Sequence, residues 1–168
     1  MVSTRAELPA DSVFQVRGIW LGALIPRQII EVVGEVNADL FIRGEDEEYP
    51  ARIRAAGYRF FCVKDSIIEH PGMRHAHLSF AGLNFFYESG VAPWKAYFLI
   101  RNHVYVRRKY TAAGKVSAFV RAIGTILLSI LSAWCFDDQK LRRSLLYLRA
   151  GWHGLTGQLN YRPAGTPG

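Results

Sequence analysis

An uncharged apolar stretch near the C-terminal end constrains the fold of this chain more than any other feature. The 15 residues from Ala122 to Phe136 carry no charged side chain. A helix that spans a bilayer needs about 20 apolar residues. Counting back to Val116 gives 21 residues with only Arg121 inside, and an arginine near the end of such a segment can extend toward water. We therefore expect a helix over residues 115–136 that either spans a membrane or lies in its interface.

Composition indicates a folded protein. Of 168 residues, 50% are hydrophobic and 21% are charged, which excludes wholesale disorder. The sequence has no Gly-X-Y triplets, long heptad array or internal repeat, so it is not a collagen, coiled coil or solenoid. Cys62 and Cys135 are too far apart for a zinc knuckle or a redox pair, and they indicate a reducing compartment.

Charge is distributed unevenly between the two halves. Residues 1–90 contain 9 Lys/Arg against 12 Asp/Glu, whereas residues 91–168 contain 12 against 2. The second half is therefore expected to meet anions such as phosphates, nucleic acid or anionic lipid. The first twelve residues have no apolar core and are not expected to be a signal peptide.

Local patterns predict an alternation of short elements followed by long helices. The elements expected in the first half are a strand or close-packed loop over 13–25, a short helix between Pro26 and Gly34, a helix over 50–57 closed by Gly57, and strands over 58–63 and 66–70 around a Lys64-Asp65 turn. Residues 72–90 are expected to form a mobile loop, and helices are expected over 93–110 and 138–155.

Four consecutive carboxylates, from Glu45 to Glu48, form the most informative polar feature. A helix N-terminus stabilises negative charge, so one interpretation is capping, with Asp46 as the N-cap. The other is that one carboxylate is a general base that takes a proton from an attacking hydroxyl. The residues alone leave both open.

His70 follows an apolar segment beside a glycine-rich loop. It is either a structural histidine or a metal ligand. His75 and His77 lie close in sequence, but the spacing matches no zinc motif.

The expected helix over 93–110 mixes aromatic and basic side chains, including Trp94, Arg107, Arg108 and Lys109. It is either a solvated basic helix or a surface for phosphate, membrane interface or single-stranded nucleic acid. The adjacent apolar run favours the membrane, and no nucleic-acid partner is expected because no known module matches.

The order of the motifs resembles the C-terminal half of family 2 glycosyltransferases, of the bacterial rhamnosyltransferase and galactofuranosyltransferase type. The motifs that carry the resemblance are GALIPRQIIEVVG (22–34), FIRGEDEEY (41–49), RIRAAGY (52–58), the predicted strand that ends in His70, PWKAYFLIRN (93–102) and GWHGLTG (151–157). Together they extend over most of the chain, from about Val16 to Leu159.

The resemblance implies a partial GT-A α/β fold over residues 1–92, followed by a membrane-associated helical region over 93–168. It implies inverting transfer of a sugar from a nucleotide-sugar donor to a cell-envelope glycan or a polyprenyl-diphosphate-linked acceptor. Asp46 would be the catalytic base, with Glu45 beside it to orient the acceptor. His70 would hold the nucleotide's divalent metal, Mn or Mg. The acceptor-binding residues that it implies are Trp20, Trp94, Tyr97, Arg101 and Asn102. The implied location is the cytoplasmic face of the inner membrane, either peripheral or with one short membrane helix.

Two departures from the family pattern matter. Pro50 falls within the first turns of the helix after Asp46, so that helix is expected to begin later or to be distorted. The chain also has no Asp-x-Asp and lacks a nucleotide-binding half of on the order of 100 residues. The isolated chain is therefore expected to be incomplete, either as the C-terminal part of a longer transferase or with a partner chain supplying that half. The alternative is a non-catalytic remnant that acts as a membrane-binding or partner module.

Overall fold

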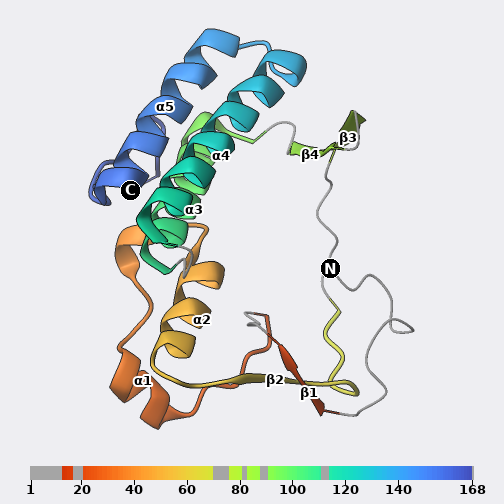
Figure 1. The fold of residues 1–168 in the computed structure, drawn as a ribbon, viewed down its shortest axis with the longest axis vertical. Helices are drawn as coiled ribbons and strands as arrows, with labels where there is room; N and C mark the ends of the chain where they lie inside the picture. The colour runs from red at the N-terminus through yellow and green to blue at the C-terminus, as the bar shows by residue number, and fades with distance from the viewer. Residues whose placement is uncertain are drawn as a thin grey trace. The chain divides into compact units, whose positions relative to one another are not determined.

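The computed structural model describes residues 13–16, 21–69, 76–80, 83–87, 91–110 and 114–167. The chain divides into two compact units, one of residues 1–36 and 46–71 and the other of residues 37–45 and 72–168. Across the described ranges the structure is mostly helical, with five α-helices and two small two-stranded sheets (Figure 1). Such a mixture is compatible with a partial α/β protein, whereas the GT-A arrangement stays a prediction, as does the division at residues 92 and 93.

In the first unit, two short strands form an antiparallel pair. Strand β1 (Val13–Val16) pairs with β2 (Phe60–Val63), and Val13 lies opposite Val63. The predicted turn follows β2, where the Ser66 N–H donates to the Val63 carbonyl at 3.1 Å. Helix α1 (Arg27–Val33) ends as predicted at Gly34, whose N–H donates to the Ile30 carbonyl at 2.8 Å. Gly34 has a φ of 80°, which favours glycine.

Helix α2 (Glu45–Ala55) begins earlier than the sequence predicts. The expected helix covered residues 50–57 and the capping interpretation placed Asp46 before the first turn. The helix over residues 50–55 and the Gly57 beyond its end, with a φ of 91°, are confirmed. The predicted start and the capping position are wrong, because Asp46 is the second helical residue and Pro50 lies inside the helix. Pro50 has no N–H, so the Asp46 carbonyl lacks its usual helical donor from residue 50. The acidic side chains offset this loss, since they lie at the positive end of the helix dipole.

One strand prediction and one loop prediction are corrected. The expected strand over 66–70 is wrong for its described residues 66–69, which have no regular structure. Ile67 is 66% exposed, because no strand pairs with this segment among the described residues. The expected loop over 72–90 instead contains strands β3 (Ala76–Phe80) and β4 (Leu83–Tyr87), paired antiparallel with Phe80 opposite Leu83.

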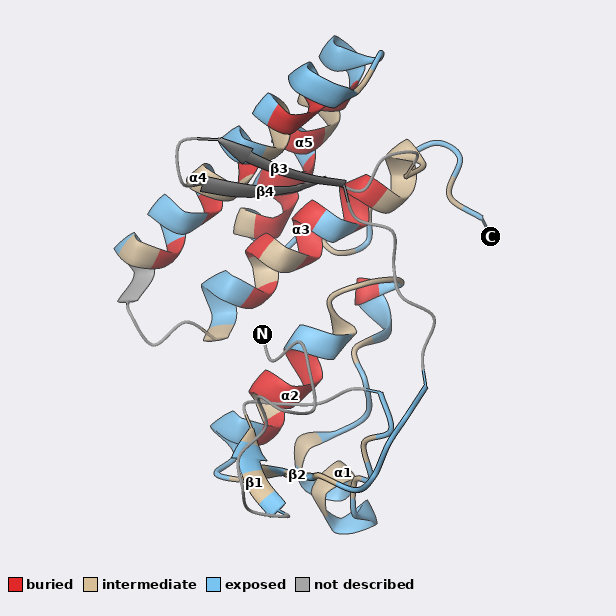
Figure 2. Ribbon diagram, turned by 90° about the vertical axis from the view of Figure 1, so that its right-hand side faces the viewer, coloured by how far each residue is buried: buried red, intermediate tan, exposed pale blue. Residues whose placement is uncertain are grey.

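The second unit contains three long helices, and each end lies within two residues of its predicted position. They are α3 (Pro93–Tyr110), α4 (Gly114–Phe136) and α5 (Lys140–Thr156). Figure 2 shows buried positions running along α3. Tyr97 and Phe98 in α3 are fully buried, and they pack with Ala122 and Ile126 of α4 and with Tyr147 and Ala150 of α5.

Small residues and one arginine fix the packing of these helices. A Cβ on Gly154 would lie 2.5 Å from the Arg101 carbonyl oxygen, and one on Gly151 would lie 2.1 Å from Ile126 Cδ1. Glycine at both positions therefore lets α5 approach α3 and α4 closely. Arg143 at the start of α5 pairs with Asp137 at 3.0 Å and donates to the Val91 carbonyl at 2.6 Å. The α4–α5 connection is thereby tied to the start of α3.

Candidate functional site

The loop that precedes the acidic helix has an unusual backbone. Phe41 and Arg43 both have a φ of 64°, and Gly44 has a φ of 89°. Side chains other than glycine rarely adopt this left-handed region, and each such residue costs on the order of 1–3 kcal/mol. The loop therefore needs support from outside its own sequence.

Two neighbouring residues of α3 provide that support. The Asn102 side-chain amide donates to the carbonyls of Leu40 at 2.9 Å and Ile42 at 3.1 Å, and also to that of Arg43. The Arg101 guanidinium donates to the carbonyls of Asp39 at 2.8 Å and Leu40 at 3.2 Å. Both side chains are 0% exposed. The loop is thus held by bonds from inside the helical unit.

The buried charge of Arg101 is compensated by carbonyls and aromatic rings. Its Nη1 donates to the Leu159 carbonyl at 2.7 Å, and its guanidinium carbon lies 4.7 Å from the Phe98 ring centroid and 5.7 Å from that of Tyr97. Burial lowers the pKa of Arg101, partly opposed by Tyr97. Burial likewise raises the pKa of the Tyr97 hydroxyl, which Arg101 opposes. The pair therefore keeps one cation and one neutral phenol in the core.

The four carboxylates at the start of α2 divide into two kinds. Glu48 is 1% exposed and pairs with Arg52 at 3.1 Å. Arg52 in turn donates to the carbonyls of Val33 at 2.7 Å and Glu35 at 2.8 Å, so this pair fastens α2 to the end of α1. Asp46 and Glu47 are exposed, and Glu45 is half-buried. Glu48 is structural, whereas the carboxylate of Asp46 is open to solvent on the first turn.

The structure places only some of the predicted site residues. Trp20 and His70 lie outside the described residues. Trp94 is half-buried, with its ring centroid 6.4 Å from that of Phe41, in the held loop. Tyr97 is buried, and its hydroxyl lies 2.6 Å from Nδ1 of His153. Trp94, Tyr97, Arg101 and Asn102 are therefore brought together in one unit, around the loop that leads to the acidic helix.

Sequence reasoning missed three residues of this cluster. Phe41 packs on Phe98 with centroids 5.1 Å apart, and the Arg162 guanidinium carbon lies 3.9 Å from the Phe41 centroid. His153 bonds to Tyr97 from α5. Phe41 begins a motif of the family resemblance, but no local pattern marks its packing role or Arg162, because both depend on a backbone set by distant residues. The GWHG segment that contains His153 was visible only as a family-like ending.

The described residues contain no group of three or more His, Cys, Asp or Glu side chains that could hold a metal ion. The divalent metal stays an implication of the resemblance.

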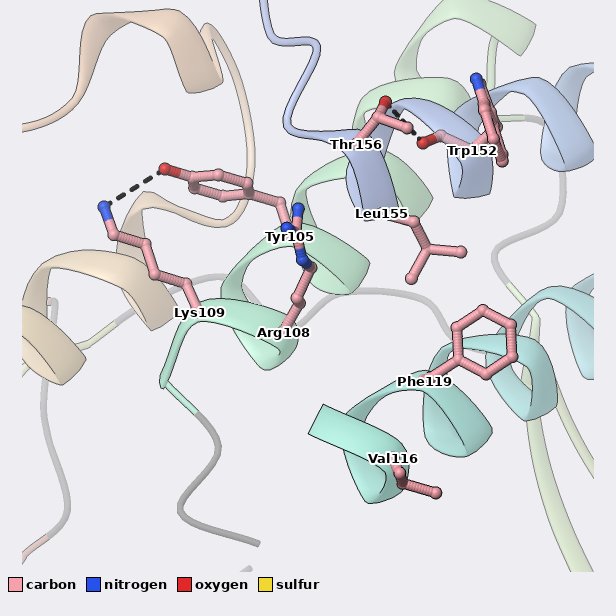
Figure 3. Close-up of a pocket in the computed structure, with 8 residues that line it drawn as sticks. All are labelled: Tyr105, Arg108, Lys109, Val116, Phe119, Trp152, Leu155 and Thr156. Atoms are coloured by element: carbon pink, nitrogen blue, oxygen red, sulfur yellow. Dashed lines mark hydrogen bonds between the residues drawn. The ribbon is translucent and has the colours of Figure 1, made fainter. Parts of the chain in front are cut away.

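A second feature is an open pocket of about 820 Å³ where three helix ends meet. Its lining combines cations of α3, Arg108 and Lys109, with apolar side chains of α4 and α5. Figure 3 shows the Lys109 ammonium directed toward the Tyr105 hydroxyl on one side, at 3.2 Å, with Val116, Phe119 and Leu155 on the other. The pocket is thus amphipathic.

Helix α4 leaves many apolar side chains uncovered. Its segment Val116–Phe136 is long and apolar enough to cross a membrane, a property that a soluble protein's core helix can share. Only 28% of the most apolar window is buried within the protein. Val116, Val120, Leu127 and Leu131 are 79%, 62%, 60% and 51% exposed. This spacing places them along one face of the helix.

Comparison of the chain with models of protein families, with curated proteins and with solved structures finds no match. The family assignment therefore stays a prediction carried by the motifs.

Proposed function

We propose that this chain is the acceptor-side part of a membrane-associated inverting glycosyltransferase, with Asp46 as catalytic base. The observation that carries the proposal is the exposed Asp46 carboxylate on the first turn of α2, in the acidic motif where the resemblance puts the base. A general base must be reachable by the hydroxyl whose proton it takes.

In the proposed reaction, Asp46 takes the proton from an acceptor hydroxyl. The hydroxyl oxygen forms a bond to the anomeric carbon of the donor sugar, and the bond from that carbon to the nucleoside diphosphate breaks. Because one displacement occurs, the anomeric configuration inverts. Glu45 orients the acceptor. Arg101 and Asn102 support the loop over residues 39–43, since their polar groups are occupied by backbone carbonyls.

The test uses the native enzyme, reconstituted with whichever chain or segment supplies the nucleotide site. Asp46→Asn keeps the size of the side chain but removes the base, so sugar transfer should fall by about 100-fold or more while donor binding stays within about twofold. The matched control is Glu47→Gln, which removes one charge from the next residue of the same turn and should retain transfer. Equal turnover of Asp46→Asn and the unchanged protein would refute the assignment.

Exposed apolar surface supports a second candidate function, a non-catalytic module that binds the membrane or a partner transferase. The uncovered face of α4 and the excess of cations in residues 91–168 favour an anionic membrane surface at the cytoplasmic face of the inner membrane. In this case vesicle flotation at low salt should carry the chain upward with anionic lipid, and Asp46→Asn should change no measurable property. A filter-binding assay at moderate salt should detect no retention of single-stranded nucleic acid.

A further inference from the structure

We infer that the pocket between Tyr105, Arg108, Lys109, Val116, Phe119 and Trp152 binds the phosphate headgroup of a diacyl phospholipid, with the acyl chains against the apolar face beside it. The inference deepens the membrane-binding part of the proposed function and does not depend on sugar transfer.

The polar side of the pocket is suited to a phosphate. Arg108 and Lys109 are exposed cations, and no carboxylate is found among the residues that line the pocket. Burial lowers the pKa of Lys109, but hydrogen bonds with Tyr105 and Tyr110 outweigh this and raise it overall, so its charge is retained. Both cations line the same pocket, and a guanidinium or an ammonium can bind phosphate oxygens.

The other side of the pocket continues into apolar surface on two helices. Val116 lines the pocket and begins the exposed row on α4 that includes Val120 and Leu127. Trp152 lines it from α5 and is 61% exposed. It ends a row in which Leu141, Leu145 and Leu148 are 71%, 70% and 51% exposed. An anion site at the end of apolar rows matches an amphiphile with a charged head.

Two other occupants fit less well. A soluble phosphate would gain nothing from Val116, Phe119 and Leu155, and a hydrated anion is not attracted to such surface. A second copy of the chain would bring another region with 12 Lys/Arg against 2 Asp/Glu over residues 91–168, and like charges would repel. Charge complementarity therefore selects an anionic lipid.

The test measures partition of the full chain onto phosphatidylcholine vesicles with and without phosphatidylglycerol. The pocket variant is the double substitution Arg108→Gln with Lys109→Gln. The matched control is Lys140→Gln with Arg142→Gln, which removes the same charge from exposed positions at the opposite end of α5. Circular dichroism checks that both variants keep their helices.

Partition of the pocket variant onto vesicles with phosphatidylglycerol should fall by about 30-fold, because each cation near an anionic surface contributes about 1 kcal/mol. Partition of the control variant should fall by less than about threefold. An equal loss in both variants would mean diffuse attraction to the membrane and would overturn the pocket assignment while leaving membrane binding intact. No vesicle binding by the unchanged chain would overturn both. Calorimetric binding of inorganic phosphate that the pocket variant loses, with vesicle partition unchanged, would assign the pocket to a soluble anion instead.

Discussion

The Nε–H of Arg101 donates a 2.8 Å hydrogen bond to Oδ1 of its neighbour Asn102, inside the helical unit. This bond orients the Asn102 amide so that its N–H groups face the carbonyls of the loop over residues 40–43. The two residues act as one support for a backbone that would otherwise relax. The acidic segment follows this loop in sequence.

The first prediction concerns Asn102. Asn102→Ala removes all donors of the amide and leaves the buried Leu40 carbonyl with fewer partners, so the free energy of unfolding should fall by about 3 kcal/mol. Arg142→Ala removes an exposed side chain and should change it by less than about 0.5 kcal/mol. Urea unfolding followed by circular dichroism measures both. Similar values for the two variants would show that the loop does not depend on Asn102.

The second prediction contrasts two helical glycines. At Gly154 a methyl group would lie 2.5 Å from a backbone oxygen of Arg101 and 2.8 Å from Val104 Cβ, whereas at Gly124 nothing lies within 4 Å. Gly154→Ala should therefore destabilise the protein by about 1–3 kcal/mol through overpacking. Gly124→Ala should stabilise it by up to about 1 kcal/mol through helix propensity. Thermal unfolding of the two variants should shift the midpoint in opposite directions, and shifts in the same direction would contradict the close approach of α5 to α3.

The third prediction concerns pH and His153. Burial lowers the pKa of His153 below 6.5, and the charges of Arg149 and Arg101 lower it further. The unfolded chain therefore binds this proton more readily than the folded protein, so stability should be full above pH 6.5 and fall as pH drops toward the folded-state pKa. For this single proton the slope in that window stays below about 1.4 kcal/mol per pH unit.

His153→Gln removes this titration and should flatten the dependence of stability on pH in the same window. Urea unfolding at a series of pH values measures the slope for both proteins. An unchanged slope in His153→Gln would assign the acid sensitivity to other groups.

The fourth prediction concerns the exposed face of α4. Leu127→Ser with Leu131→Ser removes two half-exposed apolar side chains from one helix face. Partition onto vesicles should fall by about 30-fold, because the two substitutions remove about 2 kcal/mol of favourable transfer free energy. Leu24→Ser is the matched control, because Leu24 is 97% exposed but lies in the first unit, outside the helical one. Equal partition of the two variants would exclude α4 as the membrane-binding face.

Strong local patterns explain which elements the sequence predicts correctly. Pro93 opens α3, an amphipathic pattern continues through it, and Gly34 ends α1 in a backbone that only glycine adopts easily.

The segment over 66–69 has strand-like residues but no pairing strand among the described residues. The hairpin of β3 and β4 was missed because its His, Gly and aromatic content reads as a loop, although only two residues separate its strands.

The candidate site could be predicted only in part for a related reason. Consecutive carboxylates mark the start of α2, but their sequence cannot separate the buried, paired Glu48 from the exposed Asp46. The left-handed Phe41 and Arg43 depend on bonds from Asn102, about sixty positions further along the chain. Conformations set by such distant partners leave no local pattern in the sequence.

The most direct test of the proposed function is the stereochemistry of the product together with its dependence on Asp46. Labelled nucleotide-sugars are supplied to the native, membrane-bound enzyme, and nuclear magnetic resonance determines the anomeric configuration of the transferred sugar. The account predicts inverted product with the unchanged protein and with Glu47→Gln, and a loss of at least about 100-fold with Asp46→Asn. Product of retained configuration, or undiminished transfer by Asp46→Asn, would contradict it.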